Sequence, residues 1–183
     1  MSFYQELANL LEKSPNKHKY LKLFFNISPM YRRSCGRLIE ISKDMHYIKG
    51  KIIFSYKNMN YMGTMFGGSM LSATDPIYMV QLTQILGKKY VVWDKSVKAK
   101  FKRPIKKTVW VEYIFTENEI KNIKKIIEEE DEITITKQLK IKDIEGNVYA
   151  ELEKELYVST LAFYKEKLRS VSYTHLTLPT TPY

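Results

Sequence analysis

The stretch "NYMGTMFGGSMLSATDPIYMVQLTQILG", residues 60–87, decides the fold, because it is the most apolar part of a chain that is otherwise dense in charge. It holds one charged side chain, Asp75, although 27% of the residues in the chain are Asp, Glu, Lys or Arg. Residues 64–86 are too long and too apolar for a strand, and Gly87 follows them as a helix stop. This pattern predicts a long helix that the rest of the fold buries.

Segments in which apolar and polar residues alternate lie on both sides of this helix. Before it, "GRLIEIS" and "YIKGKIIFSY" are predicted strands. In the strand after it, an apolar face that we expect to be buried alternates with a basic one: Val97, Ala99 and Phe101 against Lys98, Lys100 and Lys102. "TVWVEYIFT", "ITITKQLKIKD" and "VYAELEKELYVST" alternate too, and "EGN" between the last two predicts a hairpin turn. The charged segment 117–132 is interpreted as a connection with a helical turn or two.

The order of these elements predicts the fold class. Strands joined by short turns pair antiparallel, and their sheet must bury one face, for which the apolar helix is the obvious cover. We therefore expect an α+β fold, a strongly curved antiparallel sheet wrapped around a central helix, with extra N-terminal helices. A length of 183 residues favours a single domain, 1–169, with N-terminal helices in 1–30 and the core at about 31–160. Residues 170–183, "SVSYTHLTLPTTPY", resemble vector read-through and are interpreted as a non-native tail.

The bulk composition narrows the class of protein. A net charge of +10 can attract phosphates, nucleic acid or anionic lipid, but a general use of Lys on the surface explains it as well. Cys35 is the one cysteine, which excludes an internal disulfide, and no Cys/His spacing suits a zinc site. The first residues do not have the pattern of a signal peptide, and no stretch approaches the roughly 20 apolar residues that span a bilayer. We expect a cytoplasmic protein without membrane association, metal or cofactor.

Two interpretations of Asp75 stay open. Asp is a favoured N-cap residue and Pro suits the first position of a helix, so a helix that begins at Pro76 would use Asp75 only as its cap. Alternatively, Asp75 lies within the helix among apolar side chains, where desolvation would raise its pKa toward the range of a general base. The second interpretation gives the carboxylate a chemical role.

A glycine pair, Gly67 and Gly68, lies about two helical turns before Asp75. Free backbone amides at the start of a helix, helped by its dipole, can polarise a carbonyl group or hold an oxyanion. The same pair also suits close packing of a helix against a sheet. The spacing is therefore compatible with acyl-transfer chemistry and with a purely structural role.

Residues 60–76, "NYMGTMFGGSMLSATDP", resemble the central-helix motif of the hot-dog-fold acyl-CoA thioesterases, in particular the phenylacetate-pathway type and a bacterial branch labelled tetrameric acyl-CoA thioesterases. That family has an Asn, a Gly-Thr or Gly-Ser three residues later, a Gly-Gly pair and a catalytic Asp near the middle of the helix. The matching residues here are Asn60, Gly63, Thr64, Gly67, Gly68 and Asp75. Residues 91–113 are also similar to this superfamily, and the resemblance covers about residues 25–160.

The resemblance implies a hot-dog fold and a division of roles. Asp75 would activate water or attack the thioester carbon, the Gly67–Gly68 backbone would hold the carbonyl oxygen, and Asn60 would position water or substrate. Coenzyme A enters only as part of the substrate, so no cofactor is implied. Two protomers would pair edge to edge, as a homodimer or a dimer of dimers, with the active sites at their interface. Many relatives carry His directly before the glycine pair, where this chain has Phe66.

The sequence is compatible with three functions. The first is hydrolysis of a fatty or aromatic acyl-CoA thioester, with an apolar lining for the acyl group and a basic strand as a phosphate clamp. The predicted substrate-binding residues are Thr64, Met65, Phe66, Met70 and Tyr78, together with Lys98, Lys100 and Lys102. A solvated strand face explains the three lysines equally simply. The second function is non-catalytic binding of acyl-CoA or lipid by the same fold. The third, nucleic-acid binding through the basic strand, is least favoured because no recognition motif accompanies it.

Overall fold

The apolar segment forms a single helix, α4 (Gly67–Leu86), in the computed structural model, which describes residues 14–174 and, in 171–174, the backbone alone. Gly87 ends the helix with a φ of 83°, a conformation that an L side chain rarely adopts. Pro76 lies inside the helix, and the chain continues through it. The interpretation in which a helix begins at Pro76 with Asp75 as its cap is therefore wrong. Burial of Ala73, Ile77 and Leu82 on both sides of the proline outweighs the one hydrogen bond that it removes.

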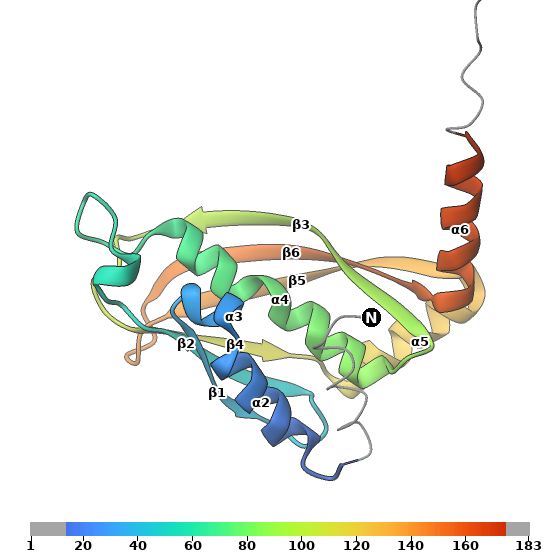
Figure 1. The fold of residues 1–183 in the computed structure, drawn as a ribbon, viewed down its shortest axis with the longest axis horizontal. Helices are drawn as coiled ribbons and strands as arrows, with labels where there is room; N and C mark the ends of the chain where they lie inside the picture. The colour runs from blue at the N-terminus through green and yellow to red at the C-terminus, as the bar shows by residue number, and fades with distance from the viewer. Residues whose placement is uncertain (1–13, 175–183) are drawn as a thin grey trace, which may run out of the picture.

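Six antiparallel strands form one sheet that curves around α4 (Figure 1). They are β1 (Gly36–Ile41), β2 (Tyr47–Ile52), β3 (Tyr90–Phe101), β4 (Val109–Ile114), β5 (Glu132–Lys142) and β6 (Val148–Thr160). Their order across the sheet is β1-β2-β4-β5-β6-β3, so β1 and β3 are the edge strands. The predicted α+β class, with a curved antiparallel sheet around a central helix, is confirmed.

The core lies between α4 and the concave face of the sheet. The predicted alternation of β4 holds: Val109, Val111 and Tyr113 are buried, while Glu112 and Ile114 are exposed. The ring of Tyr78 on α4 packs edge-on against Tyr113, with the ring centroids 5.0 Å apart. Each such buried side chain contributes roughly 1.5–3 kcal/mol to the hydrophobic stabilisation.

Two short helices, α2 (Lys17–Ile27) and α3 (Pro29–Arg33), cover the side of β1. From α2, the side-chain amide of Asn26 donates to the carbonyl of Leu38 at 2.9 Å and accepts from its N–H at 2.8 Å. The amide therefore occupies the backbone groups of Leu38 that a further strand would use, and it blocks strand pairing at that point of the β1 edge. α2 lies within the range 1–30 in which N-terminal helices were expected, and α3 extends past it to Arg33. The first 13 residues of that range lie outside the described residues.

One further helix differs from the sequence interpretation, and another was not predicted. The charged segment forms a full helix, α5 (Glu117–Glu130), which begins with a capping box between Thr116 and Glu119. Its inward side carries Ile120, Ile123 and Ile127, and this apolar stripe explains why it is more than a connection. After β6, the helix α6 (Leu161–Thr174) extends into the first residues of the segment interpreted as a tail. None of the described helices is long and apolar enough to cross a membrane.

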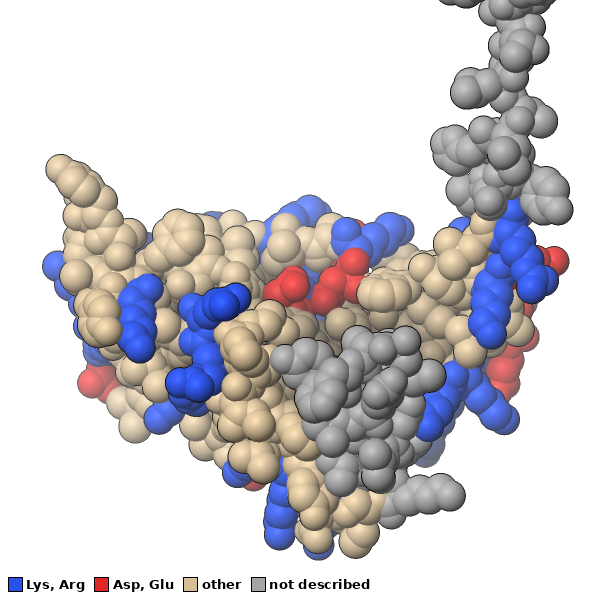
Figure 2. Space-filling model, viewed as in Figure 1, with Lys and Arg blue, Asp and Glu red and all other residues tan. Residues whose placement is uncertain are grey.

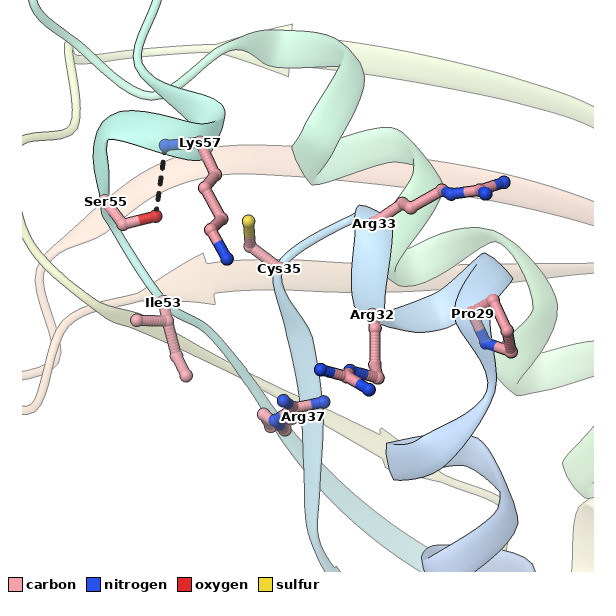
Figure 3. Close-up of a pocket in the computed structure, with 8 residues that line it drawn as sticks. All are labelled: Pro29, Arg32, Arg33, Cys35, Arg37, Ile53, Ser55 and Lys57. Carbon is pink, nitrogen blue, oxygen red and sulfur yellow. Dashed lines mark hydrogen bonds between the residues drawn. The ribbon is translucent and has the colours of Figure 1, made fainter.

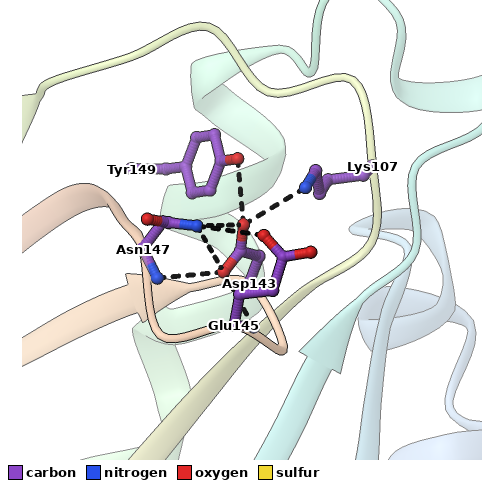
Figure 4. Close-up of polar contacts among 5 residues, drawn as sticks. All are labelled: Lys107, Asp143, Glu145, Asn147 and Tyr149. Atoms are coloured by element: carbon purple, nitrogen blue, oxygen red, sulfur yellow. Dashed lines mark hydrogen bonds and ion pairs between the residues drawn. The ribbon is translucent and has the colours of Figure 1, made fainter.

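The hairpin between β5 and β6 is organised by Asp143, whose side chain is inaccessible to solvent (Figure 4). Its carboxylate accepts hydrogen bonds from the backbone N–H groups of Glu145 and Asn147, the Tyr149 hydroxyl and the Lys107 ammonium group. Gly146 completes the predicted turn with a φ of 89°. Burial of the Asp143 carboxylate opposes its ionisation, but the bonds from Asn147 and the other donors outweigh it and hold the pKa well below its usual range.

The strand β3 departs from expectation in one respect. Val97, Ala99 and Phe101 were expected on a buried face, but all three are exposed, Val97 to 42% and Phe101 to 51%. The Phe101 ring does meet the start of α4, where it lies 3.2 Å from the position that a Cβ on Gly67 would take. The apolar face thus points to the helix side, but β3 is an edge strand, and α4 covers only part of it.

Candidate active site

A cleft of about 570 Å³ opens along one face of α4, between this helix and α3. The residues that matter for its chemistry are Met30, Arg33, Phe66, Gly68, Ser72 and Asp75. Gly68, Ser72 and Asp75 are spaced three and four residues apart, which places them on one stripe of the helix. The cleft therefore brings the predicted carboxylate and one of the two predicted glycines to the same surface.

The Asp75 side chain is 62% exposed, so it is not enclosed by apolar walls as the sequence suggested. It faces the cleft from the middle of α4, directly before Pro76. Because Pro76 has no N–H, the carbonyl of Ser72 lacks the donor that a helix normally supplies. A carboxylate and a helical carbonyl group without its usual donor thus lie one turn apart on the wall of the cleft.

A buried lysine lies behind Asp75. Lys154, on β6, has a side chain that is 1% exposed, and its ammonium group donates to the backbone carbonyl of Asp75 and lies 3.3 Å from Oδ1 of that residue. It also lies 2.9 Å from Oδ1 of Asp94 on β3. Burial raises the pKa of Asp94, and Lys154 opposes the rise without cancelling it. Lys154, from β6, therefore links α4 to β3 at the level of the Asp75 carboxylate.

The amides of the glycine pair lie at the first two positions of α4, where a helix has no acceptors for its N–H groups. The N-cap residue is Phe66, whose side chain makes no capping hydrogen bond, while the next amide, that of Ser69, donates to the Phe66 carbonyl at 3.1 Å. Gly67 and Gly68 thus present donors at the positive end of the helix dipole. Such donors are suited to a carbonyl oxygen that gains negative charge.

The separation of Asp75 from the glycine amides along α4 determines whether one chain can use both groups on one substrate. Gly68 and Asp75 are seven residues apart, which corresponds to about 10 Å along a helix axis at 1.5 Å per residue. Hydrogen bonds to one acyl group need donors and carboxylate within about 3 Å of the reacting atoms. The Asp75 carboxylate and the Gly67–Gly68 amides of a single chain therefore cannot act on the same carbonyl group.

Asn60 and Thr64 are engaged within their own loop. The Asn60 side-chain oxygen accepts from the N–H groups of Met62 and Thr64, and its amide nitrogen donates to the Thr64 hydroxyl at 3.0 Å. Gly63 occupies the tip of this loop with a φ of 69°. The polar atoms of Asn60 are consumed by the turn that leads into α4, and neither Asn60 nor Thr64 lines the cleft.

The four apolar residues predicted to bind the acyl group are separated by the fold. Phe66 is exposed and lines the cleft, whereas Met65, Met70 and Tyr78 are buried in the core. Burial also raises the pKa of Tyr78 to about 12, so its hydroxyl stays neutral at physiological pH. Met30 and Leu71 contribute apolar surface to the cleft that the sequence did not indicate.

The basic face of β3 is partly neutralised by the neighbouring strand. The Lys98 ammonium group lies 3.0 Å from a carboxylate oxygen of Glu153, and that of Lys102 lies 2.5 Å from one of Glu151. Lys100 stands between them across from Glu151 in the register. None of the three lines the Asp75 cleft.

Sequence reasoning missed Lys154 and Arg33. The signal for Lys154 was present, because it stands at an inward position of an alternating strand, where a lysine requires a partner. The alternate inward positions of β6 are Ala150, Leu152, Lys154, Leu156 and Val158. For Arg33 no such signal exists, since α3 reaches the cleft only through tertiary packing.

Comparison of the sequence with known families gives a match. A family model described as a "Domain of unknown function (DUF4442)" matches residues 18–158. The chain belongs to the DUF4442 family. No curated protein matches it.

Solved structures share the architecture of this DUF4442 chain. A Pseudomonas aeruginosa protein of unknown function, PA5026, called a "Probable Thioesterase", superposes with a TM-score of 0.64 at 19% identity, over 85% of this chain and 95% of its own. A Chlorobaculum tepidum protein of unknown function, OLEI01261, gives 0.64 at 18% identity, over 80% and 96%. Thioesterase HI1161 from Haemophilus influenzae gives 0.52 at 13% identity, over 88% and 93%. At these identities the likeness establishes the fold, and the hot-dog fold inferred from the helix motif is confirmed.

Proposed function

We propose that this protein hydrolyses the thioester of a fatty or aromatic acyl-CoA. The observation that carries the proposal is that α4 presents both an exposed carboxylate, Asp75, and uncapped helix-start amides, those of Gly67 and Gly68. A carboxylate suits the activation of water, and helix-start amides suit the charge that develops on the thioester oxygen. The thioesterase names of PA5026 and HI1161 agree with this chemistry.

In the proposed reaction, a water molecule hydrogen-bonded to Asp75 attacks the thioester carbon while the carboxylate accepts its proton. The carbonyl oxygen takes up the electron pair of the C=O π bond and is held by the Gly67 and Gly68 amides of a second copy of the chain. Collapse of this intermediate breaks the carbon–sulfur bond, and the proton on Asp75 passes to the departing thiolate. The Ser72 carbonyl, which has lost its usual helical donor to Pro76, is a second acceptor for the attacking water. The products are the free acid and coenzyme A.

The reaction needs the carboxylate and the amides from different chains, because one helix holds them about 10 Å apart. We propose that two copies associate through the β3 edge, so that Asp75 of one copy faces the glycine pair of the other. Val97 and Phe101 on this edge are exposed apolar side chains, and no strand among residues 14–174 pairs with its outer side. An open apolar edge is a surface on which a second strand adds readily.

The apolar part of the cleft supports an acyl group as the other half of the substrate. Met30, Phe66 and Leu71 provide apolar surface in the cleft that Asp75 also lines. Phe66 is exposed to 56%, and its ring stands over Gly68, where a Cβ would lie 2.2 Å from it. The ring thus occupies the site at which many relatives carry His and would contact the acyl chain rather than exchange a proton.

The proposal is tested with acyl-CoA substrates of several chain lengths by following release of free thiol. Asp75→Asn should lower kcat by roughly 10²–10⁴-fold, the usual contribution of a general base, and lower the unfolding midpoint in urea only slightly, because the side chain is exposed and Asp94 still pairs with Lys154. Glu166→Gln, which removes an exposed carboxylate on α6, is the control and should retain activity. Full turnover by Asp75→Asn would contradict the proposal. Tight acyl-CoA binding without turnover by the wild type would replace it with the non-catalytic alternative.

A further inference from the structure

A second pocket, of about 540 Å³, lies on the other side of α3 from the Asp75 cleft (Figure 3). Four basic residues line it: Arg32 and Arg33 from the end of α3, Arg37 from β1 and Lys57 from the short helix η1 (Tyr56–Asn58). The Arg33 side chain is directed away from the other three, toward the side of α4 (Figure 3). The polar side chains of Cys35 and Ser55 complete its wall. Every charged side chain in the lining is therefore cationic.

These cations lack anionic partners in the described part of the chain, where none of the four forms an ion pair with a carboxylate. One N–H of the Arg37 guanidinium group donates to the Asn26 carbonyl at 2.8 Å, and the other donors of the group remain for a ligand. The lysines of β3 differ, because Lys98 and Lys102 are already paired with Glu153 and Glu151. Positive charges gathered around a concavity raise the local concentration of anions. Figure 2 shows basic side chains gathered over α3 on the face that also carries α4.

The backbone around this pocket is fixed by local hydrogen bonds. The Ser34 hydroxyl donates to the Tyr31 carbonyl at 2.7 Å and ends α3. Cys35 follows with a φ of 61°, and its carbonyl accepts from the N–H of Ile53 at 3.0 Å, which ties the end of α3 to the segment before η1. The Ser55 side chain in turn caps η1 at the N–H of Lys57. The cations are thus carried on a frame that is already ordered, which reduces the entropy lost on binding.

Arg33 joins this pocket to the candidate active site, since it lines both this pocket and the Asp75 cleft. The helix between them, α3, is only five residues long. An elongated ligand with an anionic end and an acyl end would therefore pass over Arg33, with its acyl end beside Asp75. The nucleotide end of coenzyme A carries a diphosphate and a 3′-phosphate, about four negative charges at neutral pH.

We propose that the pocket formed by Arg32, Arg33, Arg37 and Lys57 binds the phosphate groups of the coenzyme A nucleotide, in place of the basic face of β3. The substrate class rests on the proposed thioester hydrolysis, but the anion site stands on its own geometry. Guanidinium groups recognise phosphates by paired hydrogen bonds, and the lysine adds a point charge. The ligand chemistry assigned to the site is a phosphorylated nucleotide, whether free or joined to an acyl-pantetheine arm.

The kinetic test compares one acyl group on two carriers, coenzyme A and N-acetylcysteamine, which lacks the nucleotide. In the double variant Arg32→Gln, Lys57→Gln, the KM for acyl-CoA should rise about tenfold, as expected for the loss of charge-assisted contacts at an exposed site. The kinetic constants for the N-acetylcysteamine thioester should stay unchanged. Lys121→Gln, at an exposed position on α5, controls for the lower net charge and should leave both substrates unaffected. A KM that rises for both carriers, or for neither, would overturn the inference.

The same assay separates this pocket from the earlier expectation for β3. If Lys98→Gln with Lys100→Gln raises the KM for acyl-CoA and the pocket variant does not, the phosphate site lies on β3 and the inference is wrong. A protein that hydrolyses N-acetylcysteamine and CoA thioesters with equal KM values would retain the proposed function and lose the anion site.

A measurement on the unmodified protein decides the inference even when no thioester is hydrolysed or a variant fails to fold. Cys35 is the single cysteine of the chain and lines the pocket, so its alkylation by iodoacetamide reports on occupancy. Adenosine 3′,5′-bisphosphate, which carries phosphates of the nucleotide without a thiol, should slow alkylation at least fivefold at saturation, and adenosine should not. Protection should weaken as salt rises, because the contacts are exposed and screened. Equal alkylation rates with and without the bisphosphate would overturn the inference.

Discussion

The ammonium nitrogen of Lys154 lies 3.3 Å from Oδ1 of Asp75, although the lysine side chain is 1% exposed and the aspartate side chain is 62% exposed. A contact between a buried cation and a carboxylate at the mouth of a cleft fixes the carboxylate from behind and leaves its other oxygen free. The second carboxylate, Asp94, keeps the lysine paired within the fold. Lys154 is therefore a positioning residue for Asp75.

Lys154→Met tests this role. The substitution keeps the volume and removes the charge, which leaves the Asp94 carboxylate without its cation, so the free energy of unfolding should fall by about 3 kcal/mol. Thioester hydrolysis should fall roughly tenfold in kcat with little change in KM, because Asp75 loses its anchor. Urea denaturation and initial-rate kinetics measure the two effects. The double variant Lys154→Met, Asp94→Leu should recover most of the stability but not the activity, and recovery of both would show that Lys154 acts on stability alone.

Much of the fold could be predicted from the sequence. Local patterns predicted α4, ended by Gly87, and the strand alternation of β4, because burial on one face repeats at the period of the element. The same patterns predicted the wrong environment for Val97. Its face is apolar and directed to the helix side, but whether a face is covered depends on the position of the strand in the sheet.

The candidate site was predictable only in part for the same reason. Asp75 and Gly68 share a helix, so their common face follows from their spacing alone. Asn60 matched the motif, yet its polar atoms are used within a turn, which the spacing does not reveal. Arg33 reaches the cleft from a distant segment. The length of α5 was underestimated because the many charged residues of the segment obscure the helical spacing of Ile120, Ile123 and Ile127.

The open edge of β3 leads to a prediction about assembly. Val97→Glu places a charge on the exposed apolar face, so the protein should become monomeric in sedimentation experiments and lose hydrolysis at the same time. Both effects have one cause, since the carboxylate and the amides would come from different copies. Ile144→Glu, at an apolar position that is 82% exposed on the β5–β6 hairpin, is the matched control and should leave assembly and activity intact. A monomeric variant with full activity would contradict the shared site.

The loop before α4 offers a test of the role of Asn60. Asn60→Ala removes the acceptor for the N–H groups of Met62 and Thr64, and the free energy of unfolding should fall by about 1–2 kcal/mol. Asn60→Asp keeps that acceptor, so both stability and kcat should stay close to the wild-type values. Chemical denaturation and kinetic assays distinguish the two variants. A large loss of kcat in Asn60→Asp, with stability unchanged, would instead assign the amide a direct contact with substrate or water.

The lowered pKa of Asp143 predicts how stability depends on pH. A carboxyl group whose pKa is lower in the folded state than in the unfolded state stabilises the fold above its unfolded value, about 3.9, and this contribution is lost as the pH falls toward the folded value. Asp143→Asn removes the charge that accepts from Lys107 and Tyr149, so its unfolding midpoint in urea should lie below that of the wild type at pH 7. The gap should stay constant from pH 8 to about pH 5 and narrow below about pH 4. Glu145→Gln removes a carboxylate from the same hairpin that accepts one bond, from the Asn147 amide, and should give a much smaller gap at pH 7. A gap that is independent of pH down to pH 2.5 would mean that the Asp143 network stabilises the hairpin through its shape and not through its charge.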